Sequence, residues 1–335
     1  MKIFADFHHD DLYHSLYLLL EKRLGHELFC PVGIEWYQRG WWAYSAEPRV
    51  VHEFLLDKLV DDTDKKYSLV KNSCHSRKIK AVTFEQFTKM KFDIIISSVP
   101  EHEALYFELA KQYQPQAKLI QHWGNEWKKF RSRLIKNWLV SCAPFRVPQG
   151  VNAVFYHQEF DMNLFSYEPG DPNAPIKSFV NDLPNLADWD LFLKYEKALS
   201  GSREWLSHGL GCRDGNIRPL PVLVNAMKNS SAIFHAKSLG DGFGHIIHNA
   251  FALGRLILVR GKYYEGRLAE NLIEDQKTCI DLDKHSFEEN CQLIKEYLKP
   301  SKYHKICQEA RKRFDEVVNY DKEEIEIRTF LENLI

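Results

Sequence analysis

Short apolar runs alternate with segments of helical periodicity, and this alternation constrains the fold more than any other feature of the sequence. Residues 92–99 (FDIIISSV) and 118–123 (KLIQHW) are apolar runs of strand length, and residues 101–113 between them repeat apolar side chains at helical spacing. Strands joined in this way by a helix are typical of a parallel β-sheet. The same alternation begins at residues 1–7 and resumes near residue 177. The sequence therefore predicts an α/β fold.

The chain length and the proline distribution predict two domains. The 335 residues exceed the usual size of a single hydrophobic core. The region before residue 177 is rich in proline and has little periodicity, as expected for a connection between domains. The predicted parts are an N-terminal domain at 1–145, an interdomain connection at 146–176, a C-terminal domain at 177–300 and a helical region at 301–335.

Composition excludes several classes of protein. Lys and Arg total 45 against 46 Asp and Glu, so the net charge of -1 gives no general preference for nucleic acid or membrane surfaces. The seven cysteines are scattered and form no C-x-x-C pair, which argues against a disulfide framework and a zinc site. The N-terminus MKIFADFHHDD lacks an apolar signal region, and no window reaches the roughly 18 apolar residues of a membrane span. We expect a soluble cytoplasmic protein.

The stretch SLGDGFGH combines glycines and an acid between a predicted strand and a helix that begins near His245. Ligands of parallel α/β sheets bind at the carboxyl ends of strands, and the N–H groups at a helix start favour anions. Gly240, Gly242 and Gly244 let the backbone approach a phosphate closely. Asp241 would repel a phosphate, so we expect it to accept hydrogen bonds from a sugar. The alternative is a tight turn in which Asp241 caps the helix.

This stretch resembles the C-terminal-domain motif of GT-B-fold glycosyltransferases, specifically the retaining nucleotide-sugar-dependent type (glycosyltransferase group 1, family 4-like). Asp241 matches the first acid of that motif, GFG matches its turn, and NAFALGRLIL matches the segment that follows. The resemblance implies that Asp241 contacts the donor sugar and that the turn amides face the diphosphate. Asn249 stands where the family has a second acid that holds the ribose, and Leu256 stands where proline is common.

The resemblance also implies the architecture and the chemistry. Two Rossmann-like domains would face each other across a cleft, with the C-terminal helices packing back toward the first domain. The enzyme would transfer a hexosyl or pentosyl group without a metal or another cofactor, the nucleotide-diphosphate sugar being its substrate. Cations for the diphosphate are assigned by region only, to Lys237 and Arg203, with Lys177 and Arg213 also considered. The candidate donor-binding residues are Gly240, Asp241, Gly242, Phe243, Gly244, His245, Asn249, Lys237 and Arg203.

The segment DFHHDD directly follows the first predicted strand and concentrates ionisable groups there. One of them is expected to deprotonate the acceptor if the enzyme inverts configuration, because histidine beside carboxylates is readily tuned for proton transfer. The alternative is that an aspartate caps the next helix and the histidines are solvated. The candidate catalytic residues are His8, His9, Asp10, Asp11 and Asp241.

Two further segments suggest the acceptor side. EWYQRGWWAY contains Trp41 and Trp42, which are suited to stacking on a sugar or a base, and QHWGNEW contains His122 and Glu126. Residues 127–138 (WKKFRSRLIKNW) predict an amphipathic helix with a basic surface. We expect sugar transfer to an unidentified acceptor, a carbohydrate first. The alternatives are transfer to modified bases of DNA and a non-catalytic protein that binds sugar nucleotides or carbohydrates.

Overall fold

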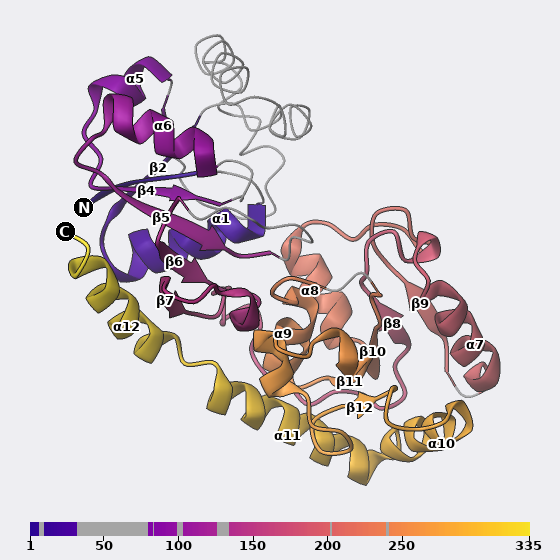
Figure 1. Ribbon diagram of the computed structural model, residues 1–335. Coiled ribbons are helices and arrows are strands. Elements are labelled where there is room, and N and C mark those ends of the chain that lie inside the picture. The colour runs from indigo at the N-terminus through magenta and orange to yellow at the C-terminus, as the bar shows by residue number, and fades with distance from the viewer. Residues whose placement is uncertain are drawn as a thin grey trace. The chain divides into compact units, whose positions relative to one another are not determined.

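The computed structural model describes residues 1–6, 10–31, 80–82, 84–98, 103–125, 134–201, 203–238 and 241–335. The chain forms two compact units. Unit 1 comprises Met1–Phe160 together with Tyr320–Ile335, and unit 2 comprises Asp161–Asn319. Each unit contains a parallel β-sheet and helices, which confirms the predicted α/β class (Figure 1).

The sheet of unit 1 has the strand order β3-β2-β1-β4-β5-β6-β7, and all of its pairings are parallel. Its first six positions repeat the strand order of the Rossmann fold, in which the order reverses between the first and fourth strands. The central strand β4 (Ile94–Ser97) is buried because it is a nearly continuous apolar run, and β5 (Lys118–Trp123) is buried over its last four residues. The strands are β1 (Lys2–Ala5), β2 (Glu27–Pro31), β3 (Lys80–Val82), β4 (Ile94–Ser97), β5 (Lys118–Trp123), β6 (Asn137–Val140) and β7 (Asn152–Phe155).

The helices of unit 1 bury apolar stripes against this sheet. A π-helical segment, Tyr17–Arg23, continues the first helix and ends before Gly25, whose positive φ of 69° stops it. The C-terminal helix also belongs to this unit, because Ile327 and Leu331 are fully buried in the same core as Ile3. The helices are α1 (Asp10–Leu16), α5 (Phe84–Lys89), α6 (Glu103–Tyr113) and α12 (Tyr320–Glu332), with a 3-10 turn at Pro144–Arg146.

The segment 146–176, predicted as an interdomain connection, contributes to both units. Its strand β7 pairs with β6 in unit 1, whereas the residues from Asp161 onward belong to unit 2. Both end residues of β7, Asn152 and Phe155, are exposed, so its sequence carries no buried apolar run. The predicted C-terminal helical region is likewise divided: α11 (Pro300–Val317) lies in unit 2 and α12 in unit 1.

The sheet of unit 2 has the parallel order β12-β11-β10-β8-β9. Strands β8 and β9 are neighbours, and the chain then crosses to the other side of β8 to form β10. The direction of winding therefore reverses between β8 and β10, which is the position where α/β sheets bind ligands at the carboxyl ends of their strands. The strands are β8 (Ile176–Ser178), β9 (Trp205–Ser207), β10 (Ala232–His235), β11 (Leu256–Val259) and β12 (Ile280–Asp281).

Helices cover the sheet of unit 2. Helix α10 (Phe287–Tyr297) begins with a capping box between Ser286 and Glu289, and α9 (His245–Ala252) packs against α11 (Figure 1). No described helix is both long and apolar enough to cross a membrane. The remaining helices are α7 (Trp189–Leu199), α8 (Leu220–Lys228), α9 (His245–Ala252) and α10 (Phe287–Tyr297), with 3-10 turns at Leu183–Asn185, Gly261–Tyr263 and Leu268–Leu272.

Candidate functional site

The loop between β10 and α9 lies at the point where the winding of the unit 2 sheet reverses. Helix α9 begins at His245, as the sequence predicts, and Gly244 caps it with φ 79° and ψ 54°. A Cβ atom on Gly244 would lie 3.3 Å from Tyr264 Cε1. Both the left-handed backbone and this close approach require glycine. The glycine therefore fixes where the chain turns from strand to helix.

The Asp241 carboxylate is the centre of a buried polar cluster. His235, the last residue of β10, places Nε2 2.7 Å from Asp241 Oδ2. Tyr264 OH donates to the same oxygen at 3.5 Å, and Lys237 forms an ion pair with Oδ1. The Asp241 side chain is 15% exposed.

The charges around Asp241 keep it ionised. Burial alone would raise the pKa of Asp241, but the hydrogen bond and charge of His235 and the charge of Lys237 hold this pKa well below its ordinary value. Burial, reinforced by the negative charge of Asp241, raises the pKa of Tyr264. The phenol therefore stays protonated and donates, while the carboxylate accepts. This is the electrostatic state that a hydroxyl-rich ligand requires.

Asp241 does not cap the helix. The cap is Gly244, with no side-chain hydrogen bond at that position. The alternative in which Asp241 is only a capping residue therefore fails, and its carboxylate stays directed to His235 and Lys237.

Phe243 anchors the turn to α9. Its ring is 3% exposed and stacks on His248, with the ring centroids 3.8 Å apart and an interplanar angle of 14°. His245 meets the same ring edge-on at 5.0 Å. His248 Nδ1 donates to Gly244 O at 3.0 Å. These contacts hold the first turn of α9, whose N–H groups have no carbonyl partners within the helix.

Asn249 supports a ligand role by its surroundings. The residue is 7% exposed, and no hydrogen-bond partner for Oδ1 lies among the described residues. A buried amide oxygen without a partner costs about 1–3 kcal/mol, so such groups are uncommon in native interiors. A ligand hydroxyl would satisfy it.

Of the cations considered from the sequence, Lys237 reaches Asp241, but Arg203 does not. Arg203 precedes β9, at the amino edge of the sheet, and donates to Pro172 O at 2.9 Å and to Asn173 Oδ1 at 3.2 Å. Lys177 and Arg213 are also engaged elsewhere. Lys177 donates to Ala226 O, and Arg213 pairs with Glu196 and Asp214.

Sequence reasoning missed a second cluster at the same sheet edge. Asp188, 1% exposed, accepts a hydrogen bond from Ser238 N and one from Tyr263 OH at 3.3 Å. Arg260 lies 3.4 Å from Asp188 Oδ1 and donates to Asp283 Oδ1 at 2.9 Å. The cluster ties together the loops that follow β8, β10, β11 and β12. Arg260 directly follows the apolar run LILV, and this position at the end of a predicted strand was the sequence feature that could have identified it as a site residue.

Some predicted site residues lie within the described ranges and others lie outside them. Among the described ones, Asp10 begins helix α1 and Asp11 lies in its first turn, so both aspartates follow β1 as predicted. The described residues contain no group of His, Cys, Asp and Glu side chains suited to a metal ion. The site candidates outside the described residues are His8, His9, Trp41, Trp42, Glu126 and Gly240.

His122 lies in the interior of unit 1, not on a surface open to an acceptor. It is fully buried, and its Nε2 lies 2.7 Å from Tyr156 OH. Burial lowers the pKa of His122 to about 3, so the ring is neutral. The helix predicted for residues 127–138 does not extend to Trp138. Asn137–Val140 forms strand β6 instead, and Trp138 stacks on Trp123 in the core.

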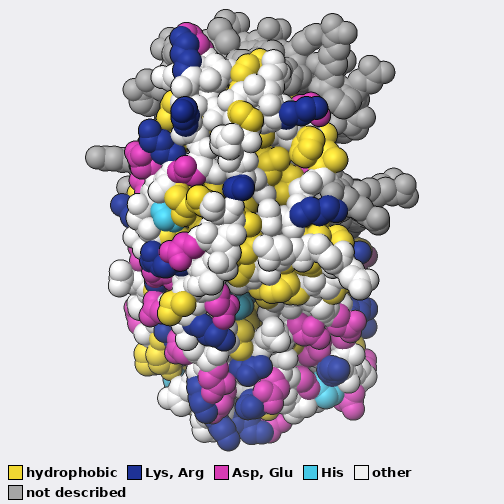
Figure 2. Space-filling view, turned by 60° about the vertical axis from the view of Figure 1, so that its left-hand side comes forward, with side chains coloured by type: hydrophobic (Ala, Val, Ile, Leu, Met, Phe, Trp, Pro, Cys, Tyr) yellow, Lys and Arg dark blue, Asp and Glu magenta, His cyan; other side chains and the backbone are white. Residues whose placement is uncertain are grey.

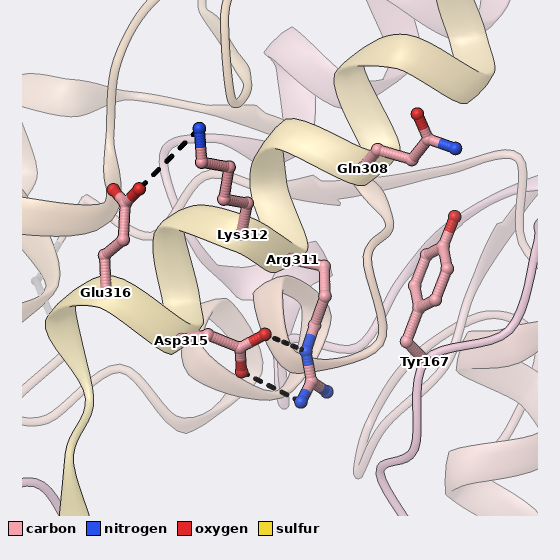
Figure 3. A pocket seen from close by; sticks show the side chains of 6 residues that line it. All are labelled: Tyr167, Gln308, Arg311, Lys312, Asp315 and Glu316. Carbon is pink, nitrogen blue, oxygen red and sulfur yellow. Dashed lines mark hydrogen bonds and ion pairs between the residues drawn. The ribbon is translucent and has the colours of Figure 1, made fainter.

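An open pocket of about 430 Å³ lies elsewhere on unit 2 (Figure 3). Arg311 and Asp315, one turn apart on α11, form a two-point ion pair in its lining, and the third guanidinium nitrogen donates to Ala252 O at 2.7 Å. Ala252 is the last residue of α9, so this pocket borders the helix end opposite Gly244. The residues that line it are Tyr167, Gln308, Arg311, Lys312, Asp315 and Glu316.

Solved structures resemble the whole chain. HepE from Anabaena, in complex with UDP and glucose, superposes with a TM-score of 0.65 at 11% identity and covers 100% of both chains. A glycosyltransferase from Rickettsia africae gives 0.65 at 13% identity, covering 99% of this chain and 98% of that one. Sucrose-phosphate synthase from Thermosynechococcus elongatus gives 0.64 at 10% identity, covering 100% and 99%. No protein-family model and no curated protein sequence matches.

These structures are GT-B glycosyltransferases, so the chain has the GT-B fold with two Rossmann-like domains. The fold implied by the motif around Asp241 is thereby confirmed.

Proposed function

We propose that the protein is a glycosyltransferase that moves a sugar from a nucleotide-diphosphate sugar to an acceptor. The observation that carries the proposal is the ionised Asp241 carboxylate, held beside the start of α9 where the unit 2 sheet reverses its winding. Fold alone does not define function, so the argument depends on this site. Structures with the same fold support it, among them HepE in complex with UDP-glucose.

The donor would be bound in three parts. Its sugar hydroxyls would donate to Asp241, its diphosphate would meet the N–H groups from Gly242 to His245, and its ribose would donate to the buried amide oxygen of Asn249. Lys237 is the described cation in contact with the acid of this loop.

Chemistry would come mainly from stabilising the departing diphosphate. The helix N–H groups supply a fixed partial positive charge where negative charge develops, and the Lys237 ammonium adds a mobile positive charge beside them. We therefore propose a metal-independent reaction, which predicts full activity in the presence of a chelator. A hexosyl donor is proposed first, because HepE binds UDP-glucose.

The acceptor is proposed to be a carbohydrate. In the part of the chain that the structure describes, the face in Figure 2 carries Lys and Arg side chains interspersed with Asp and Glu. This face gives no support to the alternative of a DNA acceptor, whose phosphates would need a continuous basic surface. If the enzyme inverts configuration, the base is proposed among His8, His9, Asp10 and Asp11. We propose a cytoplasmic location, which the seven scattered cysteines support because they form no pattern typical of a disulfide framework.

A thermal-shift panel of nucleoside diphosphates and nucleotide sugars tests the proposal. A ligand at about 100 times its Kd adds about 2.7 kcal/mol and raises the melting temperature by a few degrees. The shift with a nucleotide sugar should shrink in Asp241→Ala. Release of the nucleoside diphosphate is then followed with candidate acceptors. Binding without any release would indicate a sugar-nucleotide binding protein, and no shift with any ligand would refute the donor site.

A further inference from the structure

His235 ends strand β10 and is 1% exposed. Its ring packs at a tilt beside Tyr264, with the centroids 6.3 Å apart, and its Nε2 lies 2.7 Å from Asp241 Oδ2. A buried side chain at the end of a paired strand has little freedom to move. The position of His235 therefore fixes one oxygen of the Asp241 carboxylate.

The protonation of this pair follows from the charge of Asp241. An ionised carboxylate only accepts hydrogen bonds, so Nε2 of His235 must carry the proton. The other ring nitrogen, Nδ1, is buried and has no hydrogen-bond partner among the described residues. Every polar contact found for the imidazole is thus made to Asp241. A ring buried for packing alone would be apolar at lower cost.

His235 and Lys237, two of the three partners of the carboxylate, differ in mobility. The Lys237 side chain is 33% exposed, whereas the His235 side chain is 2% exposed. A lysine on a flexible stem can turn to a phosphate, but a buried imidazole at a strand end cannot. When an anionic diphosphate arrives, Lys237 is the partner of Asp241 that can leave.

We propose that His235 is a positioning residue that holds the Asp241 carboxylate toward the donor sugar while Lys237 turns from this acid to the diphosphate. This inference rests on the proposed function. It assigns two of the contacts of Asp241 to different halves of the donor: His235 acts on sugar recognition and Lys237 acts on the diphosphate.

The division is tested with matched ligands. The Kd of a nucleoside diphosphate and of the corresponding nucleotide sugar are measured by calorimetry, starting with UDP and UDP-glucose and continuing with the guanosine, adenosine and thymidine pairs. The variants are His235→Phe, which keeps a ring but loses the N–H, His235→Gln, whose amide nitrogen reaches the place of Nε2, and Lys237→Met.

The expected pattern separates the two roles. His235→Phe should weaken the nucleotide sugar about tenfold and leave the nucleoside diphosphate unchanged, because a hydrogen bond to a charged group is lost only at the sugar side. His235→Gln should restore most of the affinity. Lys237→Met should weaken both ligands by a similar factor, about fivefold.

Three results would overturn the inference. Equal weakening of both ligands in His235→Phe would show a merely structural role, and wild-type affinity for both would show no role. If His235→Phe does not fold, the inference is tested by comparing His235→Gln with His235→Asn, because the shorter Asn side chain cannot reach Asp241. Equal affinity of these two variants for the nucleotide sugar would show that His235 does not position Asp241. A wild-type protein that binds none of the pairs refutes the proposed function itself.

Discussion

His122 in unit 1 and His235 in unit 2 are both buried near the carboxyl end of a parallel strand, yet one has a neutral partner and the other an ionised partner. His122 lies 2.7 Å from the neutral hydroxyl of Tyr156. His235 lies at the same distance from the ionised carboxylate of Asp241. The first histidine belongs to a neutral interior, and the second supports an anion at a ligand edge.

The difference shows that burial alone does not define the role of a histidine. Burial lowers the pKa of His122 to about 3, and no charge among the described residues opposes this. At Asp241, the hydrogen bonds and the positive charges around the acid outweigh burial and lower its pKa. The neighbouring group therefore decides whether a buried imidazole stabilises a core or orders a site.

The largest expected effect is the loss of the anion itself. Asp241→Asn keeps the size of the side chain but removes the charge that orders His235 and Lys237. The affinity for the nucleotide sugar should fall about a hundredfold, the equivalent of about 2.7 kcal/mol, measured by calorimetry.

A matched acid–histidine pair controls this experiment. Asp275 Oδ2 lies 2.7 Å from His285 Nε2 in the same unit, outside the candidate site. Asp275→Asn should leave donor affinity within about twofold, since the contacts that it alters, with His285 and Asp281 N, do not include Asp241. Equal losses in both variants would contradict the special role of Asp241.

The second prediction concerns stability in acid. Because the folded pKa of His122 is about 3, below an unfolded value of about 6.5, the unfolded chain binds the extra proton between these values. The contribution of His122 is complete above about pH 6.5 and is lost as pH falls, at about 1.4 kcal/mol per pH unit. Urea unfolding between pH 7 and 4.5 measures this loss, and His122→Gln should flatten the slope.

The contribution of Asp241 to acid stability occupies a different pH window. Its lowered pKa stabilises the folded state above the ordinary value of 3.8 and loses this contribution only at lower pH. An unchanged slope above pH 4.5 in His122→Gln would show that His122 is not the neutral buried group described here.

The third prediction tests the turn that carries Asp241. Gly244→Ala should lower the free energy of unfolding by about 1–2 kcal/mol, because the left-handed backbone is strained for alanine and its Cβ would approach Tyr264. Thermal or urea unfolding measures this change. Gly201→Ala is the control, since a Cβ there meets no atom within 4 Å. Similar effects at both glycines would remove the argument for a fixed turn.

The smallest effects are expected at the predicted cations. Lys237→Met should weaken nucleoside diphosphate binding about fivefold, and the loss should shrink as salt rises, because the side chain is partly exposed. Arg203→Gln should change this affinity by less than about twofold, because Arg203 lies at the opposite sheet edge. A larger loss in Arg203→Gln would place the diphosphate elsewhere.

Local sequence patterns predicted most elements of the fold. The run KLIQHW is β5 over its whole length, and the helix predicted to begin near His245 does begin there. These elements have strong periodicity and clear ends. Strand β7 was missed because its end residues are exposed and it lies in a proline-rich segment. The helix predicted through Trp138 failed because pairing with β5 outweighed local helical spacing.

The sequence predicted Asp241 and Asn249 as site residues but not the side chains that surround Asp241. The motif gives the acid and the turn, since these are adjacent in sequence. His235 precedes Asp241 by six residues and Tyr264 follows it by 23. Only the tertiary fold brings His235, Asp241 and Tyr264 together, and no local sequence pattern predicts their contacts. The link from Asp188 to Ser238 is of the same kind.

A structure of the protein bound to the nucleotide sugar selected by the binding panel tests the central claim most directly. The account predicts a sugar hydroxyl within hydrogen-bond distance of the Asp241 carboxylate, the diphosphate at the first turn of α9, and His235 still on Asp241 while Lys237 has turned to a phosphate. A nucleotide bound away from this loop, or a sugar that makes no contact with Asp241, would contradict it.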